Sequence, residues 1–329
     1  MATATTTVPG GAGPLTGSRR FLSRLRDGDE IARLITLIFA GVVVLIVAVL
    51  VYQLWVDSAL PRHKFGWHFF LTSVWDPVFD EFGALPFIYG TVVTSALALL
   101  IAVPLGLGAA IFLAELAPQK ISDMLTFFID LLAAVPSVIY GLLGVFIIVP
   151  IMREFIQPFL GKTLGFLPLF SGPGYGIGFL TAGMVLAVMV IPFIISVSRE
   201  VLLSVPREQR EAALSLGPTR WESTWNVVVP FARTGIYGSI FLALARALGE
   251  TMAVTMVIGN TPKIAASLFA PGYSIAAVIA NEFTEATGDL YLQALVELGL
   301  VLFLLTFVLN GMARLLILLT QRRGSAVQA

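Results

Sequence analysis

Six long apolar segments constrain the fold of this chain more than any other feature of its sequence. A helix needs about 20 residues to cross a hydrocarbon core of about 30 Å, and each segment is long enough. An open sheet cannot span lipid because its unpaired backbone groups find no water there, and these segments lack the alternating pattern of barrel strands. We therefore predict an all-α, polytopic membrane protein with about six transmembrane helices. The predicted spans are residues 35–54, 87–113, 125–151, 177–197, 236–258 and 292–319.

The composition excludes several classes of protein. Only 12% of the residues are charged, about half the share of a soluble domain. The 20 basic and 20 acidic residues balance, so no net charge attracts the chain to nucleic acid. The sequence has no cysteine, and its two histidines, His63 and His68, share one polar segment. We therefore expect no disulfide and no metal site, with membrane lipid rather than nucleic acid around the chain.

The Lys and Arg residues that flank the predicted spans favour one orientation. Most of them lie on the side that carries both termini, and the opposite loops hold few. Because cytoplasmic loops are rich in Lys and Arg, we predict that both termini face the cytoplasm. The resulting division is a disordered cytoplasmic tail over residues 1–30, a first span over 31–56, an extracytoplasmic loop over 57–86, a transmembrane core over 87–319 and a cytoplasmic tail over 320–329.

No part of the sequence predicts catalysis. Residues 161–163 read Gly-Lys-Thr, like the end of a phosphate-binding loop, but Ile156 occupies the position where such a loop needs its first glycine. The tripeptide also falls in a predicted extracytoplasmic loop, away from cytoplasmic ATP. We therefore expect no ATP site, no catalytic residue and no cofactor in this chain. Any energy for transport would come from another polypeptide or from an ion gradient.

The predicted cytoplasmic loop over residues 199–233 carries signals for two short helices. Ser204 is a candidate N-cap with Pro206 in the first turn, and Gly217 suits the left-handed residue past a helix end. A Thr-x-x-Glu capping box at residues 219–222 then predicts the start of a second helix.

The first of these helices is short, and its residues leave two interpretations open. Ala212 and Ala213 are small, so the helix could lie close inside the groove of a partner protein, with Leu214 providing apolar contact. Alternatively, the arginines and Trp221 would suit a helix that lies on lipid headgroups.

Two charges fall inside the predicted fifth span. Arg246 and Glu250 are four residues apart, which on a continuous helix places them on one face, about 6 Å apart along the axis. Charges at this depth normally face a helix-bundle interior or a wet cavity. One interpretation is a solute pathway in which Arg246 offers its guanidinium to an oxyanion and Glu250 orients it or limits its attraction. The other is an ion pair that only holds helices together.

The predicted third span contains weaker candidates. Pro136 would kink this helix and free backbone groups near Ser137, which makes both residues possible pathway residues. Asp130 precedes them and is either a third pathway residue or a solvated carboxylate at the cytoplasmic interface.

The loop motif resembles a known signature. Residues 211–213 read Glu-Ala-Ala, a glycine follows after three residues, and a Val-Pro pair stands at 229–230. This pattern resembles the EAA motif of bacterial ABC importer permeases. The resemblance implies a coupling helix that docks into a cleft of a cytoplasmic ATPase. Its residues here would be Glu211, Ala212, Ala213 and Gly217.

Longer stretches narrow the resemblance. ALARALGETMAV, DLLAAVPSVIYG and VPREQREAALSLGPTRWE look like the C-subunit family of phosphate-specific (Pst) ABC importers, and the similarity extends over residues 88–317. Residues 249–253 read GETMA, where the paired A-subunit family typically has GET-Ala-Pro. The resemblance implies a type I ABC importer permease core, with Arg246 and Glu250 as the membrane Arg and Glu of the family.

This resemblance also implies partners and a location. The chain would pair with a homologous permease A subunit in a bacterial plasma (inner) membrane. A dimer of cytoplasmic ATPase subunits would bind and hydrolyse ATP, and an extracytoplasmic phosphate-binding protein would deliver phosphate to the outer loops, residues 57–86 and 259–291.

Three alternatives stay open from the residues. The first is a type I permease for another oxyanion, such as molybdate, sulfate or phosphonate, because only the motif resemblance favours phosphate. The second is an ion-coupled secondary transporter that uses Glu250 as a proton site. Such a transporter would need no ATPase and would have no use for the loop helix at residues 211–217. The third is a structural or channel-forming membrane protein in which Arg246 and Glu250 are only a packing pair.

Overall fold

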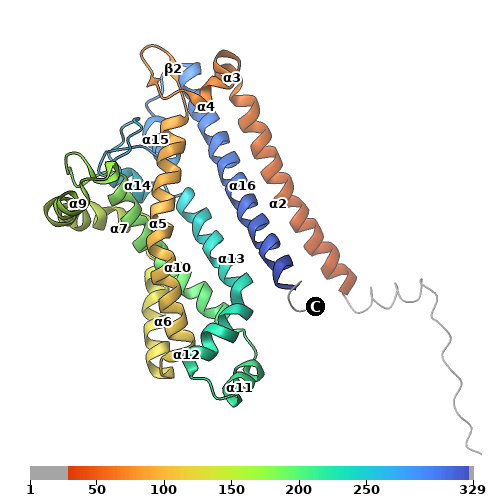
Figure 1. Cartoon of the computed structure of the whole chain (residues 1–329). Helices are drawn as coiled ribbons and strands as arrows, with labels where there is room; N and C mark the ends of the chain where they lie inside the picture. Colours follow the sequence, from red (N-terminus) through yellow and green to blue (C-terminus); the bar gives the residue numbers. More distant parts are fainter. Residues whose placement is uncertain (1–28, 326–329) are drawn as a thin grey trace, which may run out of the picture. The chain divides into compact units, whose positions relative to one another are not determined.

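A computed structural model of the chain describes residues 29–325 (Figure 1). Within them, six helices are long and apolar enough to cross a membrane, as predicted. The chain divides into two units, residues 1–56 and 57–329, which are described separately. The first unit contributes helix α2 (Asp29–Asp57), which is the first candidate span and is apolar on every face between Arg33 and Asp57. The predicted tail over residues 1–30 lies almost entirely outside the described residues.

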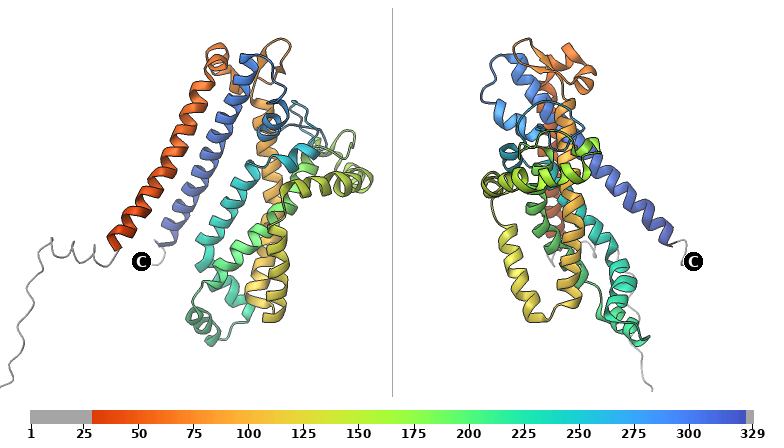
Figure 2. Two further views of the ribbon diagram at one scale, coloured as in Figure 1. Left: turned by 180° about the vertical axis from the view of Figure 1, so that it is seen from behind. Right: turned by 60° about the vertical axis from the view of Figure 1, so that its left-hand side comes forward.

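Three long helices form the centre of the second unit. They are α5 (Leu85–Ile111), α10 (Phe179–Leu203) and α13 (Val229–Leu248). α5 and α10 pack along most of their lengths, and Gly183 permits the close approach because a Cβ there would lie 2.7 Å from the Cβ of Leu97. α16 (Asp289–Ser325) follows as the last span and contacts α13 (Figures 1 and 2).

The predicted third span is wrong in its position. The helix does not run over 125–151, because α6 (Gln119–Ala133) ends before Pro136, which lacks a backbone N–H and disfavours helical geometry in the residue before it. The candidate span is Ser137–Leu164 instead, and it runs crosswise to α5 (Figures 1 and 2). Its elements are α7 (Ser137–Leu143), η2 (Gly144–Ile148), α8 (Val149–Ile151), η3 (Met152–Ile156) and α9 (Gln157–Leu164).

Widened turns explain why this span continues past its later prolines. η2 and η3 are π-helical turns, and Pro150 and Pro158 each stand two residues after one of them. A wider turn relieves the clash between a proline ring and the preceding carbonyl groups, so the helix survives. As a result, residues 161–163 lie in helix α9 and not in a loop as predicted.

The predicted fifth span is also interrupted. It begins earlier than residue 236, with α12 (Arg220–Ser223), the π-helical turn η5 (Thr224–Val228) and then α13. The helix ends at Leu248, and after a short break α14 (Met252–Val257) begins.

The two ends of the second unit carry different small elements. At one end, α11 (Arg207–Ser215) and α12 lie beyond the long helices, near the π-helical turn η1 (Phe112–Leu116). We call this the α11 end. The opposite end, here the α15 end, is a folded cap rather than the simple loop that the sequence predicted over residues 57–86. Its elements are α3 (Ala59–Phe65), α4 (His68–Leu71), the antiparallel pair β1 (Trp75–Asp76) and β2 (Glu81–Phe82), η4 (Pro168–Phe170) and α15 (Ile275–Glu282).

Glu282 joins three parts of the α15 end. Its Oε2 accepts a hydrogen bond from Nε1 of Trp75 in β1 at 2.8 Å and another from the hydroxyl of Tyr291 in α16 at 2.7 Å. Aromatic rings surround these bonds, with Phe82 stacked on Tyr291 at a centroid distance of 5.3 Å. Nearby, burial raises the pKa of Tyr273 far above its usual range, so that hydroxyl stays protonated. The carboxylate thus ties the cap to the last span.

We predict that Glu282→Ala destabilises the cap. The substitution leaves two partly buried donors without an acceptor, which costs roughly 2–6 kcal/mol at about 1–3 kcal/mol each. The thermal unfolding midpoint of the purified protein in detergent measures the loss. Glu285→Ala is the matched control, because that carboxylate is exposed and its loss should change stability by less than about 0.5 kcal/mol. Equal midpoints for the two variants would contradict the role of Glu282.

Candidate functional site

The break between α13 and α14 separates the two charges of the fifth span. The helix ends at Leu248, so Arg246 and Glu250 do not share one helix face as predicted. Glu250 instead caps the next helix, because its Oε1 accepts a hydrogen bond from the backbone N–H of Ala253 at 3.2 Å. Within the described part of the chain, Arg246 forms no ion pair with Glu250. A mutual packing pair therefore does not explain these charges.

Arg246 lies on the exposed surface of this single chain. Its guanidinium carbon stands 5.8 Å from the ring centroid of Phe193 in α10, a cation–π contact that leaves its N–H donors open. Its charge also lies within electrostatic reach of Tyr140 in α7. The side chain is thus held over one face of α10, and it donates no hydrogen bond to another of the residues that the structure describes.

The second interrupted helix lies at the junction of α6 and α7. The hydroxyl of Tyr140 donates a hydrogen bond at 2.7 Å to the carbonyl of Leu132, near the end of α6. Pro136 is the exposed residue before α7, and Ser137 is its first residue. Asp130 is exposed on α6, and its Oδ1 accepts a hydrogen bond from the hydroxyl of Ser196 at 3.1 Å.

The structure brings these predicted residues to one region. Phe193, which contacts Arg246, and Ser196, which contacts Asp130, are three residues apart on α10 and share a face. α7 and α14 also pack together, since a Cβ on Gly141 would lie 3.1 Å from the Cα of Ala253. The two helices that follow the breaks are therefore neighbours.

The arrangement has a chemical consequence. Non-helical backbone at membrane depth persists only where protein surrounds it or where it lines a water-filled cavity. Interrupted helices are where membrane transporters commonly place their substrates. An exposed guanidinium beside two such breaks can bind a passing anion through forked hydrogen bonds.

The loop residues at the α11 end divide into exposed and buried ones. Glu211, Ala212 and Gly217 are exposed, and Gly217 has the positive φ of 93° that was predicted for the residue past the helix. Ala213, in contrast, is only 6% exposed and packs against its own chain, so it is not available to a partner. Ser204 does not cap α11, because its hydroxyl donates to the carbonyl of Val201.

The predicted second helix of this loop is confirmed. α12 starts at the Thr219 capping box, in which the hydroxyl of Thr219 accepts from the backbone N–H of Glu222 and the Glu222 carboxylate accepts from the backbone N–H of Thr219.

Sequence reasoning missed one contact at the α11 end. Arg210 of α11 forms an ion pair with Glu115 of η1, with 2.9 Å between Nη2 and Oε1. Its other donors reach the carbonyls of Val205 at 2.6 Å and Leu202 at 2.7 Å. The partners are 95 residues apart in the sequence, and no local motif signals such a pairing.

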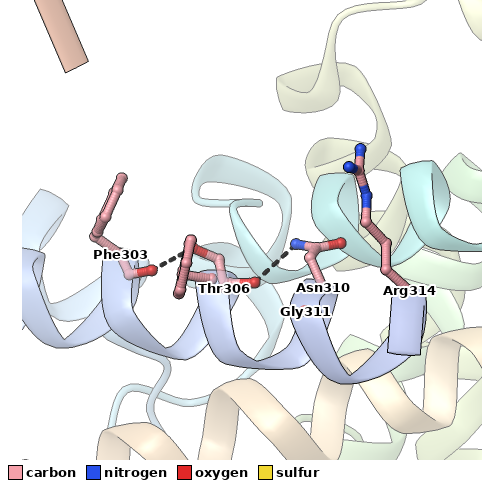
Figure 3. Close-up of a pocket in the computed structure, with 6 residues that line it drawn as sticks. Phe303, Thr306, Asn310, Gly311 and Arg314 are labelled. Atoms are coloured by element: carbon pink, nitrogen blue, oxygen red, sulfur yellow. Dashed lines mark hydrogen bonds between the residues drawn. The ribbon is translucent and has the colours of Figure 1, made fainter. Parts of the chain in front are cut away.

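A hollow of about 330 Å³ on α16 lies apart from both sets of candidates (Figure 3). The described residues that line it all come from this one helix, so it is an open groove rather than an enclosed cavity. Thr306 and Asn310 are joined there by a hydrogen bond from the Asn310 amide to the Thr306 carbonyl. The lining residues are Phe303, Thr306, Phe307, Asn310, Gly311 and Arg314.

Comparison with known proteins places these features in a family. Residues 102–318 match the family described as the binding-protein-dependent transport system inner membrane component. The chain belongs to this family. Both interrupted helices and the α11–α12 loop lie inside the matched region, while α2 and the residue 57–86 part of the cap lie outside it. A member of this family is a multi-pass membrane permease component, which agrees with the six candidate spans.

Three similar proteins are phosphate transport system permease proteins named PstC. The protein of Mesorhizobium japonicum is 46% identical to this chain, over 91% of this chain and 92% of the relative. The protein of Xylella fastidiosa strain Temecula1 is 48% identical, over 88% of this chain and 90% of the relative. The protein of Pasteurella multocida is 49% identical, over 88% of this chain and 91% of the relative. The similarity to this permease family thus extends over nearly the whole chain.

The capping role of Glu250 leads to a test. Glu250→Ala removes the acceptor for the Ala253 N–H and should lower the free energy of unfolding by about 1 kcal/mol, as for other helix caps. Glu250→Gln retains an acceptor oxygen and should lower it by less. Thermal unfolding of the purified variants measures both effects. If the two variants lose the same stability, the hydrogen bond to Ala253 is not what Glu250 contributes to the fold.

Proposed function

We propose that this chain is the permease subunit of an ATP-driven ABC importer for inorganic phosphate. The observation that carries the proposal is the 46–49% identity, over about nine tenths of the chain, to permeases named for phosphate transport. The chemistry of the interrupted helices is compatible with it, since Arg246 presents open donors to an oxyanion.

In this proposal the pathway forms between two permease subunits. An arginine within a span is costly at a lipid-facing surface, by at least about 2.5–3.5 kcal/mol. Arg246 is exposed on the isolated chain, which favours a homologous permease A subunit that covers this face and leaves a wet passage. Phosphate would pass Arg246, with Glu250 fixing the start of α14 and with Asp130, Pro136 and Ser137 at the second break.

The energy would come from other subunits. α11 is proposed as the coupling helix, which docks into a dimer of cytoplasmic ATPase subunits through Glu211, Ala212 and the turn at Gly217. ATP would be bound and hydrolysed there and not in this chain. Ala213 supports α11 from the inner side because it is buried against its own chain.

The proposed orientation follows from this docking. The α11 end would face the cytoplasm with both termini, and the α15 end would face outward in the bacterial plasma (inner) membrane. An extracytoplasmic phosphate-binding protein would then deliver phosphate to the cap. Accessibility labelling of single cysteines introduced into this cysteine-free chain tests the orientation directly.

We predict that Arg246→Gln slows phosphate uptake at least about tenfold without preventing assembly. Loss of a hydrogen bond to a charged ligand, about 1.5–3 kcal/mol, corresponds to at least about tenfold slower uptake. Labelled phosphate uptake by the reconstituted complex in proteoliposomes measures this, and co-purification of the partner subunits measures assembly. Arg246→Lys retains the charge without the fork and should lose less. A complex that falls apart on Arg246→Gln would instead assign the residue to packing.

The same assay separates the alternatives. Competition by sulfate, molybdate or phosphonate at equal concentration identifies the transported oxyanion. Uptake against a gradient by this chain alone, without any ATPase, would indicate an ion-coupled secondary transporter and would refute the proposal.

We predict that bulky residues on the coupling helix, or at the turn that follows it, prevent the ATPase from binding. Glu211→Trp obstructs the docking surface, and Gly217→Val strains the turn because its φ is 93°. Both variants should lose ATP-driven uptake and co-purification of the ATPase while the chain remains in the membrane. Lys120→Trp is the control, because Lys120 is exposed on α6 outside the docking helix. Normal uptake by both the Glu211 and the Gly217 variant would exclude the docking role.

A further inference from the structure

Arg210 connects the proposed coupling helix to two spans at once. Its Nε and Nη2 face the Glu115 carboxylate at 2.9–3.3 Å, and its Nη1 and Nη2 also donate to the carbonyls of Val205 and Leu202. Only 20% of the Arg210 side chain and 10% of the Glu115 side chain are exposed. The contact is thus a partly buried, forked ion pair, which is stronger and more directional than an exposed one.

The two attachment points lie on different transmembrane helices. Glu115 stands in η1, the widened turn that continues α5, and η1 is followed by Pro118. Leu202 lies in the last turn of α10 and Val205 just beyond it, where helix carbonyls lack partners within the helix. α5 and α10 are the most extensively packed pair in the second unit. Arg210 therefore forms hydrogen bonds at the ends of both helices of this pair.

α11 is not directly connected along the chain to α5. α11 is joined to α10 by the short connection through Val205 and to α13 through α12 and η5. α5 lies about a hundred residues earlier in the sequence. Arginine suits a permanent link, because it stays charged at any physiological pH and its planar fork fixes the direction of the contact.

We propose that Arg210 is the positioning residue that transmits movement of α11 to α5 and α10, through Glu115 and the carbonyls at the end of α10. The inference rests on the proposed docking of the ATPase on α11. A displacement of the docked helix moves Arg210, and the forked pair carries the displacement into η1. Without the pair, the ATPase still binds the exposed face of α11, but its closure reaches α5 less directly, through the packing of neighbouring helices.

The test uses the complete reconstituted complex with its permease partner, ATPase and binding protein. Arg210→Met removes the charge at similar length, and Glu115→Gln removes the opposite charge at the same size. Lys120→Gln is the control, because it removes a positive charge at the same end from an exposed side chain. The measured quantities are ATPase co-purification, basal ATP hydrolysis, and the phosphate taken up per ATP hydrolysed.

We expect both variants to retain the ATPase and its basal hydrolysis, while phosphate taken up per ATP falls at least about tenfold. Because the two residues act as one unit, the double variant should be no worse than the poorer single variant. The control should keep the wild-type ratio.

Three outcomes would overturn the inference. They are an unchanged uptake-to-hydrolysis ratio in both single variants, multiplied losses in the double variant, and loss of the ATPase from the complex, which would make the pair a fixture of the docking surface. Failure of the proposed function is recognised separately, because the wild-type complex would then show no ATP-driven phosphate uptake at all.

Discussion

The demand that lipid places on the polypeptide backbone governs this structure. The surrounding lipid offers no hydrogen-bond partners, so each amide group that faces it needs a partner from the protein itself. The two helix breaks, at residues 134–136 and 249–251, meet this demand with side chains. The hydroxyl of Tyr140 serves the carbonyl of Leu132, and the carboxylate of Glu250 serves the N–H of Ala253. Each of these two hydrogen bonds thus supplies a partner to one backbone group at the edge of a non-helical segment near Arg246.

The two arginines described above show opposite uses of the same side chain. Arg210 has its donors occupied by Glu115 and by helix carbonyls, so it acts as a fixed joint between elements. Arg246 rests against Phe193 through its guanidinium face and keeps its donors free. A free guanidinium is useful for an anion that must be released again, whereas a saturated one is useful for holding parts of the protein together.

Much of the fold could be predicted from local sequence signals. The failures occur where the outcome depends on helix geometry or tertiary packing that no local pattern shows. The number of spans, the Thr219 capping box and the left-handed Gly217 follow from hydropathy and from capping rules that act over a few residues. The third span was misplaced because Pro136 ends a helix while Pro150 does not, and only the π-helical turn before Pro150 explains the difference. The link between Arg210 and Glu115 depends on tertiary packing and has no local signal.

All four π-helical turns described here are followed two residues later by a proline, and η5 leads directly into α13. A π-helical turn accommodates one residue more than an α-helical turn. η5 therefore sets the angular phase of α13, and shortening it by a single residue would rotate everything downstream by about 100°. The azimuth at which Arg246 emerges from its helix is therefore set by η5, which ends 18 positions earlier at Val228.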